Sequence, residues 1–196
     1  MIVDVVTTKS PKNRTVLTFL LALANLMSFS VGIITAAILS RYMDVVEYGT
    51  YRQVIFIYTT LLVVFSMGLP KCYSYFLARA SIEYGADIVK LLNKLFFALS
   101  ALFSIFLYLG ADFISDIMGN ELLVDNLRYF AITPMLLMPV MGVESILVVY
   151  GYGAMVLLYV FAGRLMMIVC TVMSVVVFDG GVTGAICGFV VSSAFS

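Results

Sequence analysis

The feature that most constrains this sequence is a run of 26 residues, Thr15 to Ser40, that contains no charged side chain. A helix needs about 20 mostly apolar residues to cross the roughly 30 Å hydrocarbon core of a bilayer. The composition agrees, because 63% of the 196 residues are hydrophobic and 11% are charged, whereas soluble domains carry about a quarter charged residues. A soluble fold of this size would expose more apolar surface than water tolerates. The sequence therefore predicts an all-α integral membrane protein.

Similar apolar runs recur along the chain and predict about six transmembrane helices. After a tail at 1–14, the membrane bundle occupies 15–196, with spans near 15–40, 52–69, 91–111, 129–150, 155–178 and 181–196. The first run is too long for the roughly 7–15-residue apolar core of a signal peptide, so we expect a retained span. The last run holds 16 residues, about 24 Å of helix, and the chain stops while still apolar. We therefore expect a truncated last helix in the front part of a longer protein.

The distribution of basic residues predicts the orientation. Seven Lys and Arg residues fall on the side of the amino terminus and three on the opposite side, which also carries most of the acidic residues. The seven are Lys9, Lys12, Arg14, Lys71, Arg79, Lys90 and Lys94, and the three are Arg41, Arg52 and Arg128. Because short cytoplasmic loops are enriched in Lys and Arg, the amino terminus is expected in the cytoplasm of a cell (inner) membrane. The charged segment 38–56 is then an outer turn between the first two spans.

The segment 71–90, "KCYSYFLARASIEYGADIVK", is neither fully apolar nor loop-like. Read as a helix, it places its apolar residues on one face and its charged residues on another. That pattern is typical of an amphipathic helix lying along the cytoplasmic interface. A simple solvated connector is the alternative. Pro70, in the "GLP" corner that precedes this segment, is interpreted as the end of the second span.

Several function classes lack support in the sequence. The net charge of zero offers no basic face for nucleic acid. With no His, and with Cys72, Cys170 and Cys187 widely scattered, we expect no metal site and no cofactor, and interpret the cysteines as small packing residues. No phosphate-binding loop and no nucleophile with an adjacent base is present, so we expect a protein that is not an enzyme and has no catalytic residues.

Small residues repeat every four positions in two of the runs. In lipid, helices associate through close packing at such residues, so each series predicts a helix–helix seam. The series are Ala24, Ser28, Gly32, Ala36 and Ser40 in the first run, and Gly180, Gly184, Gly188, Ser192 and Ser196 in the last.

Polar side chains within the spans are the candidates for function, because each is costly in hydrocarbon. Arg164 lies near the middle of the fifth span and Glu144 lies in the fourth. Across the tight turn at 151–154 their depths differ by about four residues, roughly 6 Å of helix rise. They could form a structural ion pair or share a water-filled cavity, where Arg164 would meet an anionic group. Asn25 in the first span is a weaker candidate.

Two prolines predict that the fourth span is broken. Pro134 and Pro139 lie five residues apart in "AITPMLLMPVMG", and each removes a backbone hydrogen bond. Broken spans in transporters line binding sites or act as hinges.

Three segments carry a resemblance to a known family. They are "ILSRYMDVVEYGTYRQ", with Arg41 followed by Tyr48 and Gly49, "FSMGLPKCYSYFLARA" at the end of the second span, and "GGVTGAICGFVVSS" in the last run. Over nearly the whole chain, the pattern resembles the amino-terminal half of the polysaccharide biosynthesis, or O-antigen (Wzx-type), flippases of the multidrug/oligosaccharidyl-lipid/polysaccharide exporter superfamily.

The resemblance implies one lobe of a MATE-like transporter with twelve to fourteen helices around a central cavity. Such proteins move polyprenyl-linked oligosaccharides across the membrane by alternating access, so the expected partners are the bilayer, that substrate, and a missing carboxy-terminal lobe or a second copy. Arg164, Arg41 and Lys71 are then candidates for binding the anionic head group, with Glu144 and Asn25 beside them. The aromatic candidates for stacking on sugars are Tyr58, Tyr129 and Tyr159.

The sequence alone also allows two other functions. A cation-coupled exporter of drugs or small molecules would need an intramembrane acid, and Glu144 is the one the sequence offers. A membrane scaffold or a non-transporting fragment would need no site at all.

Overall fold

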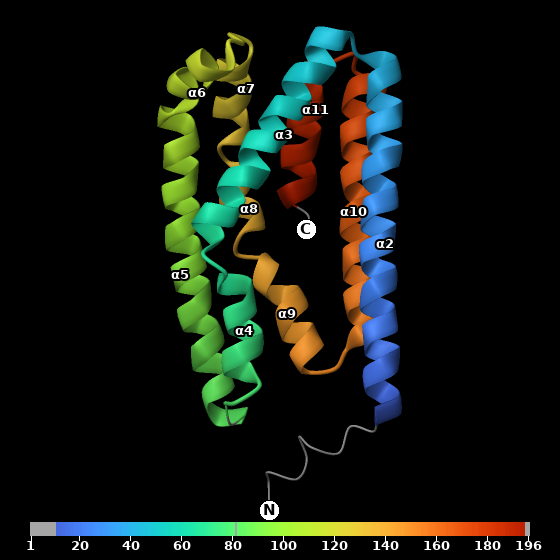
Figure 1. Ribbon diagram of the computed structural model, residues 1–196, viewed down its shortest axis with the longest axis vertical. Helices are drawn as coiled ribbons and strands as arrows, with labels where there is room; N and C mark the ends of the chain where they lie inside the picture. Colours follow the sequence, from blue (N-terminus) through green and yellow to red (C-terminus); the bar gives the residue numbers. More distant parts are fainter. Residues whose placement is uncertain (1–10, 81, 195–196) are drawn as a thin grey trace, which may run out of the picture.

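The computed structural model describes residues 11–80 and 82–194 and is all-α over that part of the chain (Figure 1). The helices are α2 (Pro11–Tyr42), α3 (Val45–Ser66), α4 (Leu69–Leu77), α5 (Ile82–Leu109), α6 (Ala111–Met118), α7 (Leu123–Phe130), α8 (Thr133–Leu137), α9 (Met141–Val149), α10 (Gly153–Val176) and α11 (Gly181–Ala194). They run alternately up and down the long axis as one bundle, with α2 beside α10.

Four helical stretches of the described residues are long and apolar enough to cross a membrane, and the number is five when the bent pair α3–α4 is counted as one span. The four are Thr18–Tyr42, Tyr84–Leu109, Leu123–Val149 and Gly153–Val176, while α11 is apolar but shorter. Large apolar side chains cover the outside, with Phe29 and Val63 each 74% exposed. Lipid is the solvent that such a surface suits. The prediction of an all-α integral membrane protein is confirmed.

The charged segment 38–56 contains the turn that joins α2 to α3, but most of it is helical. Asp44 caps α3: its carboxylate accepts from the backbone N–H of Glu47 at 2.7 Å, and the Glu47 carboxylate accepts from the N–H of Asp44 at 3.3 Å. This capping box starts the helix at Val45, seven residues before the predicted boundary at Arg52.

The "GLP" corner separates α3, which ends at Ser66, from α4, which begins at Leu69. Met67 and Gly68 both adopt a left-handed conformation, with φ of 46° and 72°. Pro70 then lies in the first turn of α4, where its missing N–H costs no helical hydrogen bond. The axes of α3 and α4 differ by 41°. The helix of the second span thus stops at this corner, four residues before Pro70, and a new helix starts at an angle to it.

The predicted interfacial helix over 71–90 is also wrong. Its first part belongs to α4 and its last part to α5, and these two helices pack against each other. Tyr73 of α4 is fully buried, stacks on Phe96 of α5 at 5.8 Å between ring centroids, and donates a hydrogen bond to Asn93. Of the apolar face that suggested an interfacial helix, Tyr73 and Leu77 are buried within the bundle, whereas Phe76 is 47% exposed.

The fourth span is broken where the prolines predict. Pro134 lies in the first turn of α8, and Pro139 lies in the link between α8 and α9. In Figure 1 the helices α7, α8 and α9 follow one another down the bundle as separate pieces. The breaks turn α9 toward α4, against which it packs. This packing needs Gly142, since a Cβ there would lie 2.6 Å from the Tyr73 ring.

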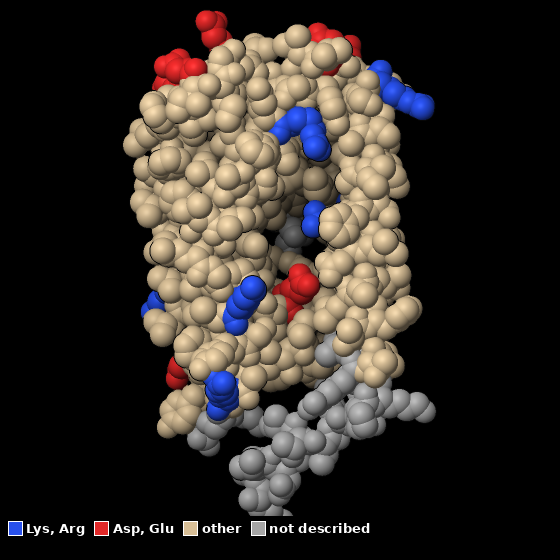
Figure 2. Space-filling model, in the orientation of Figure 1, with Lys and Arg blue, Asp and Glu red and all other residues tan. Residues whose placement is uncertain are grey.

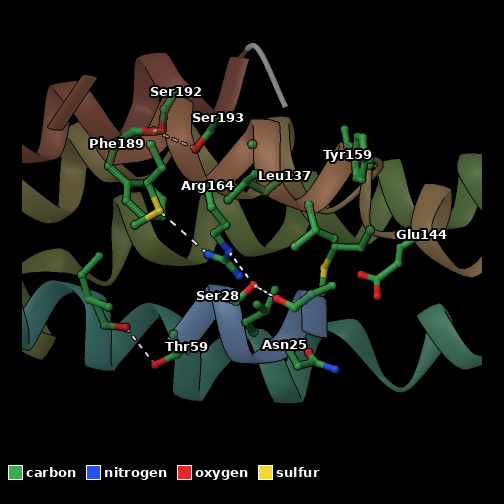
Figure 3. Close-up of a pocket in the computed structure, with 18 of the residues that line it drawn as sticks. Asn25, Ser28, Thr59, Leu137, Glu144, Tyr159, Arg164, Phe189, Ser192 and Ser193 are labelled. Atoms are coloured by element: carbon green, nitrogen blue, oxygen red, sulfur yellow. Dashed lines mark hydrogen bonds between the residues drawn. The ribbon is translucent and has the colours of Figure 1, made fainter. Parts of the chain in front are cut away.

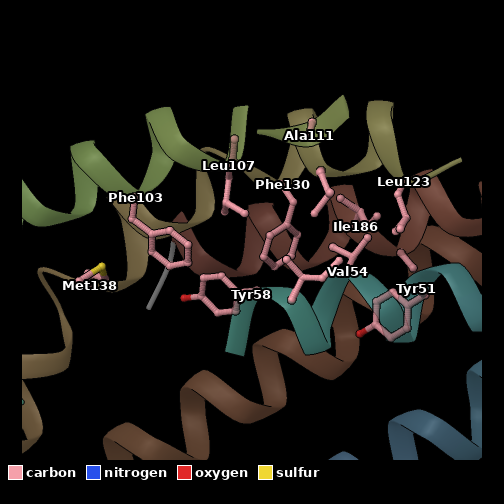
Figure 4. Packing of buried hydrophobic residues seen from close by; sticks show 14 of the residues in the cluster. Tyr51, Val54, Tyr58, Phe103, Leu107, Ala111, Leu123, Phe130, Met138 and Ile186 are labelled. Atoms are coloured by element: carbon pink, nitrogen blue, oxygen red, sulfur yellow. The ribbon is translucent and has the colours of Figure 1, made fainter. Parts of the chain in front are cut away.

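Aromatic side chains form the centre of the core between α3, α5 and α7 (Figure 4). Tyr58 stacks on Phe103 at 5.7 Å and meets Phe130 edge-on at 5.1 Å. Phe65 also stacks on Phe103, at 4.6 Å. Such pairs contribute about 0.5–1.5 kcal/mol each beyond the area they bury.

Only one of the two predicted small-residue seams is closely packed along its described length. On α11, a Cβ at Gly184 would lie 2.9 Å from the Ser174 carbonyl oxygen, and one at Gly188 would lie 2.6 Å from the Cys170 carbonyl oxygen. On α2, Ala24 is buried, but a Cβ at Gly32 would meet no atom within 4 Å. Ser196 lies outside the described residues.

Candidate functional site

A cavity of about 600 Å³ lies inside the bundle, with walls from α2, α3, α8, α9, α10 and α11. Figure 2 shows the middle of one face hollowed, with basic and acidic groups at the hollow. The charged lining residues of this cavity are Arg164 and Glu144. The polar lining residues are Asn25, Ser28, Tyr58, Thr59, Tyr159, Ser192 and Ser193.

Arg164 projects from α10 across the cavity toward α2 (Figure 3). Its Nε donates a hydrogen bond to Ser28 Oγ at 3.3 Å, and Ser28 Oγ in turn donates to the Ala24 carbonyl oxygen at 3.0 Å. Within the described residues no acidic side chain forms an ion pair with Arg164. A cationic group in a largely apolar membrane cavity, with no anion against it, favours the entry of an anionic ligand.

Glu144 lines the same cavity from the first turn of α9. Figure 3 places its carboxylate farther along the cavity from the guanidinium of Arg164. Among the described residues, the ion pairs join Lys90 to Asp87 and Arg128 to Asp112, and none involves Glu144. Of the two arrangements expected from the sequence, the structure has the shared cavity and not the ion pair.

The serine and threonine hydroxyl groups of the cavity are arranged as acceptors. Thr59 Oγ1 donates to the Ile55 carbonyl oxygen at 2.9 Å. Ser192 and Ser193 donate to the carbonyl oxygen of Phe189, at 2.7 and 2.8 Å. Each hydroxyl hydrogen is thus used by the helix backbone, which leaves lone pairs for a ligand that donates hydrogen bonds. Sugar hydroxyl groups are donors of this kind.

The sequence pointed to only part of this lining. Asn25 was a candidate and does line the cavity. Ser28 and Ser192 were interpreted only as packing residues, and Thr59 and Ser193 were not singled out. A polar residue within an apolar run is the only signal that could have found them, and it is weak because Ser and Thr are satisfied by their own helix.

Two of the predicted substrate-binding residues are not brought to the cavity. Arg41 lies exposed in the last turn of α2, and Lys71 lies exposed in the first turn of α4. Neither lines the cavity. The helix that carries Lys71, α4, is bent by 41° from α3 and packs against α9 and α5.

The three tyrosines predicted to stack on sugars do not all lie at the cavity. Tyr159 lines the cavity from α10. Tyr58 borders it too, but only 4% of its surface is exposed, because its ring is part of the aromatic core. Tyr129 is exposed on α7 and does not line this cavity.

Fold and cavity together define a multi-pass membrane protein whose helical bundle holds a largely apolar cavity with a few polar and charged side chains. The family model described as "Polysaccharide biosynthesis protein" matches residues 17–195. The chain therefore belongs to the polysaccharide biosynthesis (Wzx-type flippase) family, as the resemblance in the sequence implied. This is a transporter-type family and not a class of enzymes. No curated protein and no solved structure matches the chain significantly.

Proposed function

We propose that the protein is part of a flippase that moves lipid-linked oligosaccharide units across the cytoplasmic (inner) membrane by alternating access. A polyprenyl-linked sugar combines an anionic phosphate linkage with a polar head, and both are costly to drag through hydrocarbon. The observation that carries the proposal is the position of Arg164, which places a cation without an ion-pair partner within a cavity of about 600 Å³ inside the described part of the bundle.

The two kinds of polar group in the cavity suit the two parts of such a head group. The guanidinium of Arg164 would bind phosphate oxygens, because its N–H groups match their geometry. The hydroxyl oxygens of Thr59, Ser192 and Ser193 would accept from sugar hydroxyls, and Asn25 can both donate and accept. The hollow side of the cavity would be completed by a second bundle, either a further lobe or a second copy.

The amino terminus is proposed to lie in the cytoplasm. Acidic side chains gather at the end of the molecule where α6 and α7 lie (Figure 2), whereas Arg79 lies between α4 and α5 and Lys90 lies near the start of α5, at the other end. Single cysteines test this in protein whose three native cysteines are replaced by alanine. K90C should react with a membrane-impermeant maleimide only in inverted vesicles, and E121C only in intact cells or spheroplasts.

The transport proposal is tested with Arg164→Gln in the source cells. We expect lipid-linked oligosaccharide to accumulate in the inner leaflet as strongly as after deletion of the gene. Arg41→Gln removes the same charge outside the cavity and should complement the deletion. Normal transport by Arg164→Gln would refute the role of this cavity.

A second candidate function is a cation-coupled exporter of small molecules, which the carboxylate of Glu144 in the cavity favours. In that case deletion of the gene would raise drug sensitivity without accumulation of a lipid-linked glycan. The same deletion strain therefore separates the two functions.

A further inference from the structure

The guanidinium of Arg164 is held at one edge by a residue of another helix. Ser28 belongs to α2, and its Oγ accepts from Arg164 Nε at 3.3 Å (Figure 3). The Ser28 hydroxyl has a single hydrogen, which it donates to the Ala24 carbonyl oxygen at 3.0 Å. Its oxygen can therefore act toward Arg164 only as an acceptor, so the direction of the hydrogen bond between α2 and α10 is determined.

This hydrogen bond leaves the other edge of the guanidinium available. Within the described residues, the remaining contact of the group is a long one from Nη1 to Met167 Sδ at 3.9 Å, and sulfur is a weak acceptor. With Nε occupied, the edge formed by Nη1 and Nη2 is the one that can bind two oxygens at once. A planar guanidinium binds phosphate in this bidentate way.

We propose that Ser28 is a positioning residue: it fixes the plane of the Arg164 guanidinium so that the Nη1–Nη2 edge binds two oxygens of one phosphate group. The proposal rests on the proposed function, since it takes Arg164 as the phosphate-binding residue. It adds that one hydroxyl group of α2 raises the affinity for the phosphate by orienting the guanidinium of Arg164.

The chain offers a matched control for this role. Ser30 lies two residues farther along α2, is exposed, and donates to the Leu26 carbonyl oxygen at 3.0 Å, as Ser28 does to Ala24. It does not line the cavity. Ser30→Ala therefore reproduces the local effect of Ser28→Ala on the helix and lacks any effect on Arg164.

The experiment measures the affinity of the purified protein, in detergent, for radiolabelled farnesyl pyrophosphate, with farnesol as the uncharged competitor. Ser28→Ala should weaken binding by about tenfold, the lower end of what one hydrogen bond to a charged group contributes. Ser28→Thr keeps the hydroxyl and should restore the affinity, while Ser30→Ala should leave it unchanged. In the Arg164→Lys background, which has no Nε–H, Ser28→Ala should have no further effect.

Each alternative result has a defined meaning. An equal loss from Ser28→Ala in the original protein and in the Arg164→Lys background would show that Ser28 acts through helix packing, and would overturn the proposal. So would an unchanged affinity of Ser28→Ala. If Arg164→Gln itself binds farnesyl pyrophosphate like the original protein, the proposed function fails as well. Loss with Arg164→Gln but not with Ser28→Ala rejects the positioning role alone.

Discussion

Arg164 on α10 and Ser28 on α2, 136 positions apart in the sequence, are joined by a hydrogen bond of 3.3 Å across the cavity wall. The two helices lie side by side along the bundle (Figure 1). The acidic residue of the cavity, Glu144, takes no part in this contact, and the group that α2 presents to the guanidinium is a neutral hydroxyl. An arginine held in this way keeps its full charge available to a ligand.

The two charged residues of the cavity are expected to contribute to stability independently. Since Arg164 and Glu144 form no ion pair among the described residues, Arg164→Gln and Glu144→Gln should have additive effects on the unfolding free energy. A double-mutant cycle, measured by thermal unfolding in detergent, should give a coupling below about 0.5 kcal/mol. A coupling several times larger would mean that the two side chains pair after all.

The seam between α10 and α11 should not tolerate a methyl group. At Gly188 a Cβ would lie 2.6 Å from the Cys170 carbonyl oxygen and 2.8 Å from Thr171 Cα, both parts of the backbone. Gly188→Ala is expected to destabilise the protein by about 1–3 kcal/mol, as overpacking does. Gly32→Ala is the matched control on α2, where a Cβ would meet no atom within 4 Å. Equal melting temperatures for the two variants would contradict this packing.

Gly142 is expected to be needed for the contact between α9 and α4. Its Cβ would lie 2.6 Å from two ring carbons of the buried Tyr73, so Gly142→Ala should lower the melting temperature in detergent. A smaller side chain in place of Tyr73 should relieve the clash. We therefore expect Tyr73→Leu combined with Gly142→Ala to be more stable than the sum of the two single changes predicts. Strict additivity would argue that the two residues do not touch.

Asn120 should hold the link between α6 and α7 to α3. Its Nδ2 donates to Thr50 Oγ1 at 3.0 Å and to Gln53 Oε1 at 2.6 Å, and its Oδ1 accepts from the Leu122 N–H at 3.1 Å. Asn120→Ala should cost about 2 kcal/mol of unfolding free energy and speed hydrogen exchange in the α6–α7 link. Glu121→Ala, at an exposed neighbouring position, is the control. Unchanged exchange in Asn120→Ala would exclude this anchoring role.

Local patterns in the sequence were enough for the class of protein and for most of the helices. Long uncharged runs predict spans because length and hydrophobicity are properties of one segment. The break near Pro134 and Pro139 followed for the same reason, since proline acts on its own helix. The close approach at Gly184 and Gly188 was also visible as a repeat of small residues.

Tertiary structure decided which polar residues meet. One cavity is lined by Arg164, Glu144 and Asn25, and it is not lined by Arg41 or Lys71. The reason is that the position of a helix in the bundle depends on bends and packing, which no local pattern encodes. The left-handed pair at 67–68 redirected the second span. In the sequence, Ser28 is one small residue in an apolar run, and only the packing of α2 against α10 brings its hydroxyl group to Arg164.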